Sequence, residues 1–225
     1  MEFNELSNLI KTRRSIRAWQ EKDVPEQILM EAIELATWAP NGGNAQNWHF
    51  YIILNKAVIK SIADATAAGL AEMMAWPEMA LIGGVWPPAP PPGANRPAPR
   101  PNILGKAPAL IAVTTRKIAN PLEKVFAARA KVDPKGDAAR QANITLASRI
   151  QSVSAAIAYL LLVLHQMGLG AVWMTGPLPQ SKGEIEKILK VPAETDVVAL
   201  IPVGYPAETP VNTRKPVSEV CQIIK

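Results

Sequence analysis

Short apolar runs, separated by longer segments of helical periodicity, constrain the fold of this chain more than any other feature. Runs at His49–Leu54, Ala109–Val113 and Val197–Val203 each predict a buried strand, and Ala171–Met174 predicts a shorter one. Strands mixed with helices along one chain are typical of an α+β sandwich, in which helices cover a small sheet. We therefore expect this fold class.

Apolar residues three or four positions apart predict the helices that would cover this sheet. The expected helices span residues 3–10, 25–36, 56–75, 138–166 and 181–189. The second half of 138–166 is surrounded by apolar residues, which predicts the central helix of the core. Its most apolar stretch, Val153–Leu164, is too short to span a bilayer, so no membrane partner is expected. The polar tail from Gly204 onward has too little apolar content to fold on itself, so it should lie on something else, such as a partner subunit.

A proline-rich insertion interrupts this pattern at about 76–106. Nine of the 21 prolines lie between Pro77 and Pro101, a composition that predicts neither a helix nor a central strand. It is either a linker between domains or a lid within one domain. The lid is favoured, because too little chain follows for a second domain and long insertions often cover binding sites. Trp76, Met79 and Trp86 would then contact substrate or simply pack on the core.

Composition excludes several classes of function. The net charge of +5 comes from 24 basic and 19 acidic residues that are interspersed, which does not predict a nucleic-acid partner but suits an anionic ligand. A single cysteine, Cys221, excludes an internal disulfide and a cysteine metal cluster. His49 and His165, the two histidines, are too few for a histidine-rich metal site, and both are expected to be structural. No signal peptide is visible at the N-terminus, so we expect a cytoplasmic protein.

The usual catalytic signatures are also missing. The sequence contains no GxGxxG dinucleotide loop, no GxxxxGK[ST] phosphate loop and no GxSxG nucleophile turn. No side chain stands out as a nucleophile. A bound cofactor is therefore expected to supply the chemistry.

The run Arg13-Arg14-Ser15-Ile16-Arg17 is the clearest candidate for a binding site. Guanidinium groups present forks of donors that match phosphate oxygens, and the serine hydroxyl adds another donor. This composition predicts a site for a dianion. The alternative is that the arginines only satisfy carbonyls at the end of the preceding helix.

Three further segments become informative beside this run. Ala39–Trp48 is a glycine-bearing loop with several amide side chains, which can match the donors and acceptors of a planar heterocycle. Asn44 and Gln46 could equally cap the loop itself. Gly168–Pro177 is a strand-to-turn junction that could aim backbone N–H groups at a ligand, and Arg214-Lys215 adds two cations in the tail.

Taken in order, these segments resemble the nitroreductase family of FMN-dependent oxidoreductases. The resemblance covers almost the whole chain and consists of the RRSxR run, the helix ending in AP, the NxQxW loop, the GLG…TGP segment, IPVGYP and RKP. It implies one nitroreductase-like domain over residues 1–225, with helices around a small mixed sheet. It also implies a homodimer that binds FMN at its interface and exchanges its C-terminal tails.

The resemblance also implies roles for individual residues. The FMN phosphate, ribityl chain and pyrimidine edge would be bound by Arg13, Arg14, Ser15 and Arg17, with Arg214 and Lys215 closing on the phosphate. Pro40, Asn41, Asn44 and Gln46 would line the flavin, partly across the dimer interface, and Thr175 and Gly176 would lie beside its reactive N5 edge. The family's loop often reads APSxxNxQPW, and here Asn41 replaces the serine and Asn47 the second proline.

The implied reaction is a ping-pong transfer of hydride. NADH or NADPH would reduce the flavin at N5 and leave, and an electron-poor acceptor such as a nitroaromatic or a quinone would then be reduced. Arg17, Thr175 and Gly176 are the candidate catalytic residues, with Arg17 stabilising charge on the reduced pyrimidine end. In dehalogenase members of the superfamily a threonine hydroxyl near N5 favours one-electron chemistry. Here we expect backbone contacts from Thr175 or Gly176 to dominate and to favour two-electron reduction.

Two other functions stay open at the level of sequence. A flavin-dependent reductive dehalogenase, or another specialised member of the same superfamily whose chemistry acts on a halogenated aromatic or on the flavin itself, would use the same cofactor. A binding module for phosphorylated ligands or nucleic acid would use the same arginines without redox chemistry. Such a module would be colourless, and its ligand binding would depend strongly on salt.

Overall fold

The computed structural model describes residues 2–83, 103–117 and 121–225. Its helices are α1 (Phe3–Thr12), α2 (Glu26–Ala36), α3 (Lys56–Met74), α4 (Pro121–Ala130), α5 (Pro134–Leu146), α6 (Ser148–Gln166) and α7 (Leu178–Leu189). Its strands are β1 (Trp48–Ile53), β2 (Ala109–Arg116), β3 (Gly170–Ala171) and β4 (Thr195–Gly204). Short 3-10 helices lie at Gly42–Asn44, Pro77–Ile82, Leu104–Lys106 and Val217–Glu219. The α+β class predicted from the sequence is confirmed.

The four strands form one sheet in the order β1-β2-β4-β3, and each neighbouring pair is antiparallel. β2 and β4 are central, so that Ile111 pairs with Ile52 on one side and with Ile201 on the other. The expected mixed character is limited, among the described residues, to an isolated parallel bridge between Ser15 and Ala171. β1 and β3 are the two edge strands.

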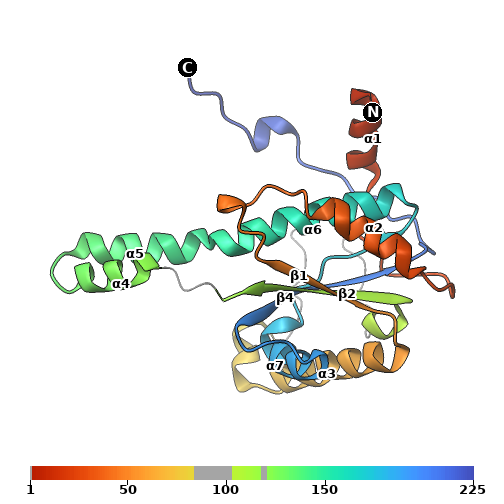
Figure 1. The fold of residues 1–225 in the computed structure, drawn as a ribbon, viewed down its shortest axis with the longest axis horizontal. Coiled ribbons are helices and arrows are strands. Elements are labelled where there is room, and N and C mark those ends of the chain that lie inside the picture. The colour runs from red at the N-terminus through yellow and green to blue at the C-terminus, as the bar shows by residue number, and fades with distance from the viewer. Residues whose placement is uncertain (1, 84–102, 118–120) are drawn as a thin grey trace.

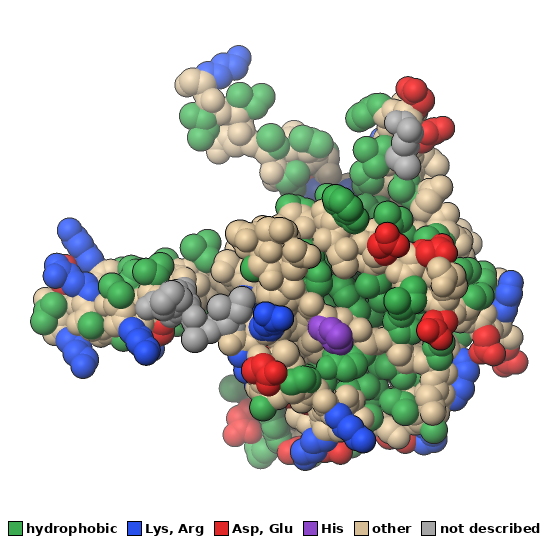
Figure 2. All heavy atoms as spheres, in the orientation of Figure 1, with side chains coloured by type: hydrophobic (Ala, Val, Ile, Leu, Met, Phe, Trp, Pro, Cys, Tyr) green, Lys and Arg blue, Asp and Glu red, His purple; other side chains and the backbone are tan. Residues whose placement is uncertain are grey.

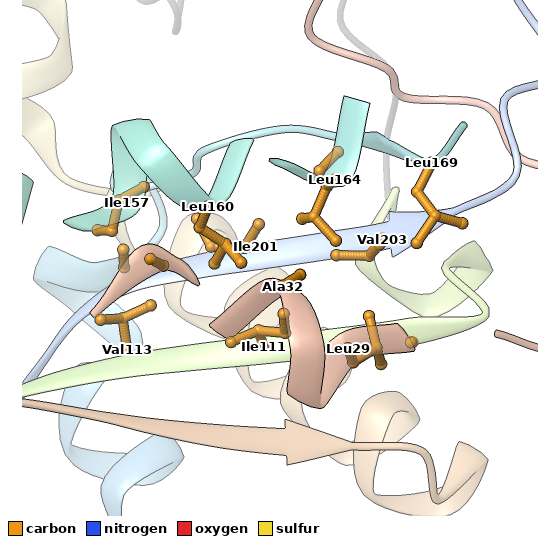
Figure 3. Packing of buried hydrophobic residues seen from close by; sticks show 14 of the residues in the cluster. Leu29, Ala32, Ile111, Val113, Ile157, Leu160, Leu164, Leu169, Ile201 and Val203 are labelled. Carbon is orange, nitrogen blue, oxygen red and sulfur yellow. The ribbon is translucent and has the colours of Figure 1, made fainter. Parts of the chain in front are cut away.

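Helices cover both faces of this sheet (Figure 1). Because successive residues of a strand point to opposite faces, Ile111 and its neighbour Leu110 enter different layers. Ile111 packs with Leu29 of α2 and Leu160 of α6 (Figure 3), whereas Leu110 packs with Ile62 of α3 in the layer that also contains α7. Burying each such side chain stabilises the fold by roughly 1.5–3 kcal/mol.

Three parts of the chain project from this body: α1, the hairpin of α4 and α5, and the C-terminal tail (Figure 1). They carry exposed apolar side chains, as Figure 2 shows for the hairpin and the tail. The largest exposures include Phe3 at 80%, Val132 at 77% and Ile224 at 90%. The helix predicted from Phe3, Leu6 and Ile10 is therefore present, but none of its residues is buried. The described chain leaves these apolar side chains exposed.

The hairpin departs from the sequence prediction. The sequence pattern does not predict α4, in which Leu122 and Val125 are exposed while other apolar residues are only partly buried. The single helix expected at 138–166 is instead two helices, which meet at Ala147 in a left-handed conformation with φ 43°. A Cβ on Gly136 would collide with the backbone of Ala130, so the glycine lets α5 pack directly on the end of α4.

The described part of the proline-rich insertion contains a helix. Residues Pro77–Ile82 form a 3-10 helix, which corrects the expectation that residues 77–101 hold none. Pro77 occupies the first turn, where a missing N–H breaks no helical bond. Residues 84–102 lie outside the described residues, so the lid and the single domain over 1–225 stay predictions.

The helical run Pro134–Gln166 is long and apolar enough to cross a membrane, by length and composition alone. Within the fold, Ile157, Leu160 and Leu164 of α6 pack on the sheet, so this half is the central core helix that the sequence predicted (Figure 3). Only 22% of the apolar stretch is buried within the chain. Much of it is therefore left for another surface to cover.

Candidate functional site

The predicted anion-binding run lies at the β3 edge of the sheet. Its backbone runs alongside β3, with Ser15 bridged to Ala171 and the Ile16 N–H donating to the Ala171 carbonyl at 3.1 Å. The indole N–H of Trp19 donates to the Gly170 carbonyl at 2.8 Å. The RRSxR run and the GLG segment, more than 150 residues apart in sequence, are thus held side by side.

Two glycines make this contact possible. A Cβ on Gly170 would lie 2.6 Å from the Ile16 side chain, and one on Gly204 would lie 2.7 Å from Pro108 and 2.8 Å from Trp19. These distances are too short for any larger residue without displacement. The glycines of the GLG and VGYP motifs therefore allow the arginine-bearing segment to pack against the sheet.

The beginning of the tail completes the same edge. The Gln20 N–H donates to the Tyr205 carbonyl, and the Ala207 N–H donates to the Ala18 carbonyl. Glu208 then places one carboxylate oxygen 2.5 Å from the Arg17 backbone N and 3.0 Å from the Ala18 N. Glu208 was missed by sequence reasoning, since a lone glutamate in a polar tail carries no signal of such a contact.

Arg14 and Arg214 act electrostatically on Arg13 at this edge. Burial, and then the charges of Arg214 and Arg14, lower the pKa of Arg13 below its ordinary value. The tail therefore brings Arg214 within electrostatic reach of the RRSxR run. Lys215 instead lies 3.8 Å from the carboxylate of Glu219 in an exposed ion pair.

Arg14 and Arg17 also bond the backbone around them. Arg14 donates to the carbonyls of Lys11 and Arg13 at 2.5 and 2.8 Å, so part of its role is to close the end of α1. Its Nε is nevertheless buried without a hydrogen-bond partner. Arg17 donates to the Ser15 carbonyl at 3.3 Å. The helix-end interpretation thus accounts for part of Arg14 but leaves one donor unsatisfied.

The amide loop lies over α6. Its 3-10 helix Gly42–Asn44 contacts α6, where the Gly42 N is 3.4 Å from the Ser152 hydroxyl. The Asn41 side chain accepts from the Gln46 N–H at 2.9 Å, which closes the loop on itself. Asn44 and Gln46 both have positive φ, at 51° and 43°, a strained conformation for residues with a side chain.

Asn47 has a role that the motif comparison did not give it. It is buried, with 4% of its surface exposed, and its amide donates to the Thr115 hydroxyl at 3.0 Å. This bond fixes the end of the amide loop to β2. Asn47 also lines a shallow cleft beside β1 with Tyr51 and Arg116, and that cleft contains none of the predicted site residues.

Thr175 and Gly176 lie at the start of α7, and both are exposed. Met174, just before them, exchanges two backbone hydrogen bonds of 2.9 Å with Leu200, and the Leu178 N–H donates to the Thr175 carbonyl. The turn is therefore fixed to β4. A Cβ on Gly176 would meet nothing within 4 Å, so the fold itself leaves open space there.

Two groups of the predicted residues, the arginine run and the amide loop, lie at opposite ends of α6, while Thr175 and Gly176 precede α7. The arginine edge meets α6 at His165, whose Nε2 lies 3.0 Å from the Thr12 hydroxyl, whereas the amide loop meets it at Ser152. At 1.5 Å per residue, these two contacts are about 20 Å apart along the helix. One chain thus brings together Arg13, Arg14, Ser15, Arg17 and Arg214, but not the amide loop.

Comparison with known proteins identifies a family. The sequence profile described as the nitroreductase family matches residues 10–205. A protein of Methanothermobacter thermautotrophicus named as a putative NADH dehydrogenase/NAD(P)H nitroreductase is 28% identical, over 89% of this chain and 77% of its own length.

Two solved structures show the same fold. A BluB-like flavoprotein from Clostridium difficile 630 superposes with a TM-score of 0.76 and 26% identity, and the alignment covers 100% of both chains. An iodotyrosine deiodinase bound to FMN and 3-iodo-L-tyrosine superposes with a TM-score of 0.65 and 23% identity, over 98% of this chain and 97% of the other.

Proposed function

This chain belongs to the nitroreductase family, and on that premise we propose that it is an FMN-dependent oxidoreductase acting on electron-poor acceptors such as nitroaromatics or quinones. The observation that carries the proposal is the meeting of Arg13, Arg14 and Arg214 at one edge of the sheet. Three guanidinium groups repel one another in the free chain. A bound dianion would attract all three guanidinium groups, and this attraction would offset their mutual repulsion.

The residues present fit the FMN phosphate. Arg14 has a buried Nε with no hydrogen-bond partner, and burying such a donor costs free energy unless a ligand satisfies it. The pKa of Arg13, lowered by burial and by the charges of Arg214 and Arg14, would return toward its ordinary value once an anion bound. We assign Arg13, Arg14, Ser15, Arg214 and Lys215 to the phosphate and the adjoining ribityl chain.

The other predicted residues would act on the ring system. When bound, FMN would supply the hydride chemistry, accepting hydride from NADH or NADPH and passing it to the acceptor. Arg17 would stabilise negative charge at the pyrimidine end, with its backbone held by Glu208. Thr175 and Gly176 would offer backbone N–H groups in the open space at the start of α7, and no side chain at 176 would block the approach.

A homodimer would complete this site. The amide loop with Pro40, Asn41, Asn44 and Gln46 lies about 20 Å along α6 from the arginine edge. Two copies related by a two-fold axis, with their α6 helices antiparallel, would bring the loop of one chain to the arginines of the other. The exposed apolar faces of α1, the hairpin and the tail would then be covered. The tail, which has no core of its own, would lie on the partner.

The visible spectrum of the purified protein is the direct test. We expect a yellow protein that releases FMN on denaturation, whereas a phosphate-ligand or nucleic-acid module would be colourless. Arg13→Glu should yield apo-protein, because it reverses a charge inside the cluster. Lys60→Glu makes the same charge change on the exposed face of α3 and should keep FMN. If Arg13→Glu binds FMN as well as the wild type does, the arginines only satisfy carbonyl groups at the end of α1.

Turnover then tests the reaction. Purified protein should oxidise NADH or NADPH with a nitroaromatic or quinone acceptor, and Arg17→Ala should keep FMN while losing about tenfold or more in kcat, as expected for one charge-assisted hydrogen bond. Bound FMN without turnover of either nicotinamide would contradict the assigned reaction.

Reductive dehalogenation is a second candidate. It is favoured by the likeness to an iodotyrosine deiodinase and by the Thr175 hydroxyl at the start of α7. The test is iodide release from 3-iodotyrosine by the reduced protein. Release that is lost in Thr175→Ala would support this candidate, whereas acceptor turnover unchanged by that substitution would support the nitroreductase-type reaction.

A further inference from the structure

His165 ends the core helix α6 beside the arginine edge and has no role in the site as assigned so far. Its Nε2 lies 3.0 Å from the Thr12 hydroxyl, at the last residue of α1. That hydroxyl has one proton, which it donates to the Asn8 carbonyl at 2.8 Å. With its proton on that carbonyl, the Thr12 oxygen can accept a hydrogen bond from Nε2 of His165. A further proton on the ring would bind at Nδ1.

The charges around the ring are positive. Burial lowers the pKa of His165, and the charges of Arg13 and Arg14, which follow α1 directly, lower it further. From the tail, Arg214 acts on Arg13 in turn. Among the described residues no ion pair with His165 is found on any of these elements. The free site therefore favours the neutral form of the ring.

We propose that His165 is a further phosphate-binding residue, which takes up a proton when a dianion binds among Arg13, Arg14 and Arg214. This inference rests on the proposed FMN function, because the FMN phosphate is the dianion concerned. The bound dianion outweighs the neighbouring positive charges in its effect on the ring. Protonation at Nδ1 leaves the Nε2 bond to Thr12 intact, so the ring need not move.

Linkage gives the sign of the effect. The pKa of His165 is low in the free protein and rises when the dianion binds, so binding takes up a proton. His165 therefore strengthens FMN binding as the pH falls through the range between these two values. Because the ring is only partly buried, the gain should resemble that of a partly exposed charge pair, roughly threefold to fivefold in affinity.

The test compares FMN dissociation constants of wild type and His165→Gln between pH 8.5 and pH 6, by fluorescence quenching on reconstituted protein. Glutamine can still donate to Thr12 but cannot become a cation. The two proteins should bind FMN equally at pH 8.5, and the variant should bind about threefold to fivefold more weakly at pH 6. The phosphate of FMN titrates near pH 6 in both proteins, so the ratio of constants removes its contribution.

Two controls isolate the phosphate and the histidine. Riboflavin, which lacks the phosphate, should show a variant-to-wild-type ratio that does not change with pH. His49→Gln removes the chain's other histidine, in β1, and should behave as wild type. A ratio for FMN that is constant with pH would overturn the proposal and leave His165 as a hydrogen-bonding partner of Thr12. Failure of the wild type to bind FMN at any pH would instead overturn the proposed function.

Discussion

At the scale of single residues, two backbone hydrogen bonds at the arginine edge depend on one side chain. Glu208 accepts from two successive backbone N–H groups, those of Arg17 and Ala18, and so fixes the segment that carries the guanidinium groups. Hydrogen bonds to a charged group contribute about 1.5–3 kcal/mol each. A single carboxylate in the tail thus sets the position of residues 190 places earlier.

We predict that Glu208→Ala lowers the free energy of unfolding by about 2 kcal/mol and weakens FMN binding, because two backbone donors lose their partner. Glu208→Gln keeps an acceptor oxygen and should retain most of both. Urea unfolding and FMN titration measure these effects. Glu184→Ala is the matched control, since its exposed pair with Lys187 at 3.1 Å should contribute little. Equal behaviour of Glu208→Ala and Glu184→Ala would contradict the assignment.

At the scale of elements, the site is positioned by close approach and by charge. The arginine-bearing segment packs on β3 across Gly170, while an ion-pair cluster joins the opposite end of the sheet to its helices. In that cluster the Asp196 carboxylate of β4 contacts Lys182 of α7 at 2.7 Å and Arg149 of α6 at 3.2 Å. Lys117, after β2, lies 3.6 Å away. Both helical layers are thus tied to the sheet where the hairpin leaves the body.

Gly170→Ala should destabilise the protein by about 1–3 kcal/mol and reduce its FMN content, because the new Cβ would lie 2.6 Å from Ile16. Thermal unfolding and the flavin-to-protein ratio report the two effects. Gly176→Ala adds the same methyl group in open space and should leave stability unchanged. A Gly170→Ala protein as stable as the Gly176→Ala protein would show that the arginine-bearing segment around Ile16 can shift away from β3 at no cost in stability.

The ion-pair cluster predicts a pH dependence of stability. Burial alone would raise the pKa of Asp196, but the hydrogen bond from Lys182 and the nearby cations outweigh it and lower the pKa. A lowered carboxylate pKa stabilises the fold above the ordinary value of about 3.9, and this contribution is lost as the pH falls through the folded value. Asp196→Asn should therefore cost about 2 kcal/mol at pH 7, with the difference from wild type shrinking below about pH 4.

Urea unfolding at several pH values measures this difference. Glu184→Gln, which removes the exposed partner of Lys187, is the control and should cost little at any pH. A cost for Asp196→Asn that stays constant down to pH 2 would mean that its charge is not the source of the stability.

At the scale of the whole molecule, the single chain leaves apolar surface exposed and keeps two groups of candidate site residues apart. α1, the hairpin and the tail, which project from the body (Figure 1), carry exposed apolar side chains, and the arginine run and the amide loop contact opposite ends of α6. The proposed two-fold partner would cover this apolar surface and would also bring the two groups of site residues together. The proposed flavin site shared between two chains therefore requires the proposed dimer.

Complementation between chains tests the shared site. Arg13→Glu damages the arginine edge, and the double variant Asn41→Ala, Asn44→Ala damages the amide loop, so each homodimer should be poor in FMN. A heterodimer of the two would contain one intact site and should regain up to half of the wild-type FMN, as measured on differently tagged, co-purified chains. No recovery in an authenticated heterodimer would show that both groups serve the same chain's site.

The sequence by itself determined the elements, the fold class and the family resemblance. Apolar spacing, as in Ala109–Val113 or Phe3–Ile10, is a local signal, and it placed every strand and most helices within a few residues. It missed α4, which contributes no fully buried residue to the core of the described chain. It also missed the break at Ala147, where a non-glycine residue takes a left-handed conformation that no turn residue marks.

Only the tertiary structure decided which motif residues meet. Arg13 and Arg214, Arg17 and Glu208, and Thr12 and His165 are brought together over 150 residues or more, by a segment packed on β3 across Gly170. The same packing separates the amide loop from the arginines along α6. Local patterns encode burial and backbone preference, which fix elements, whereas contacts between distant segments depend on how the whole core closes, and no single stretch of sequence contains that information.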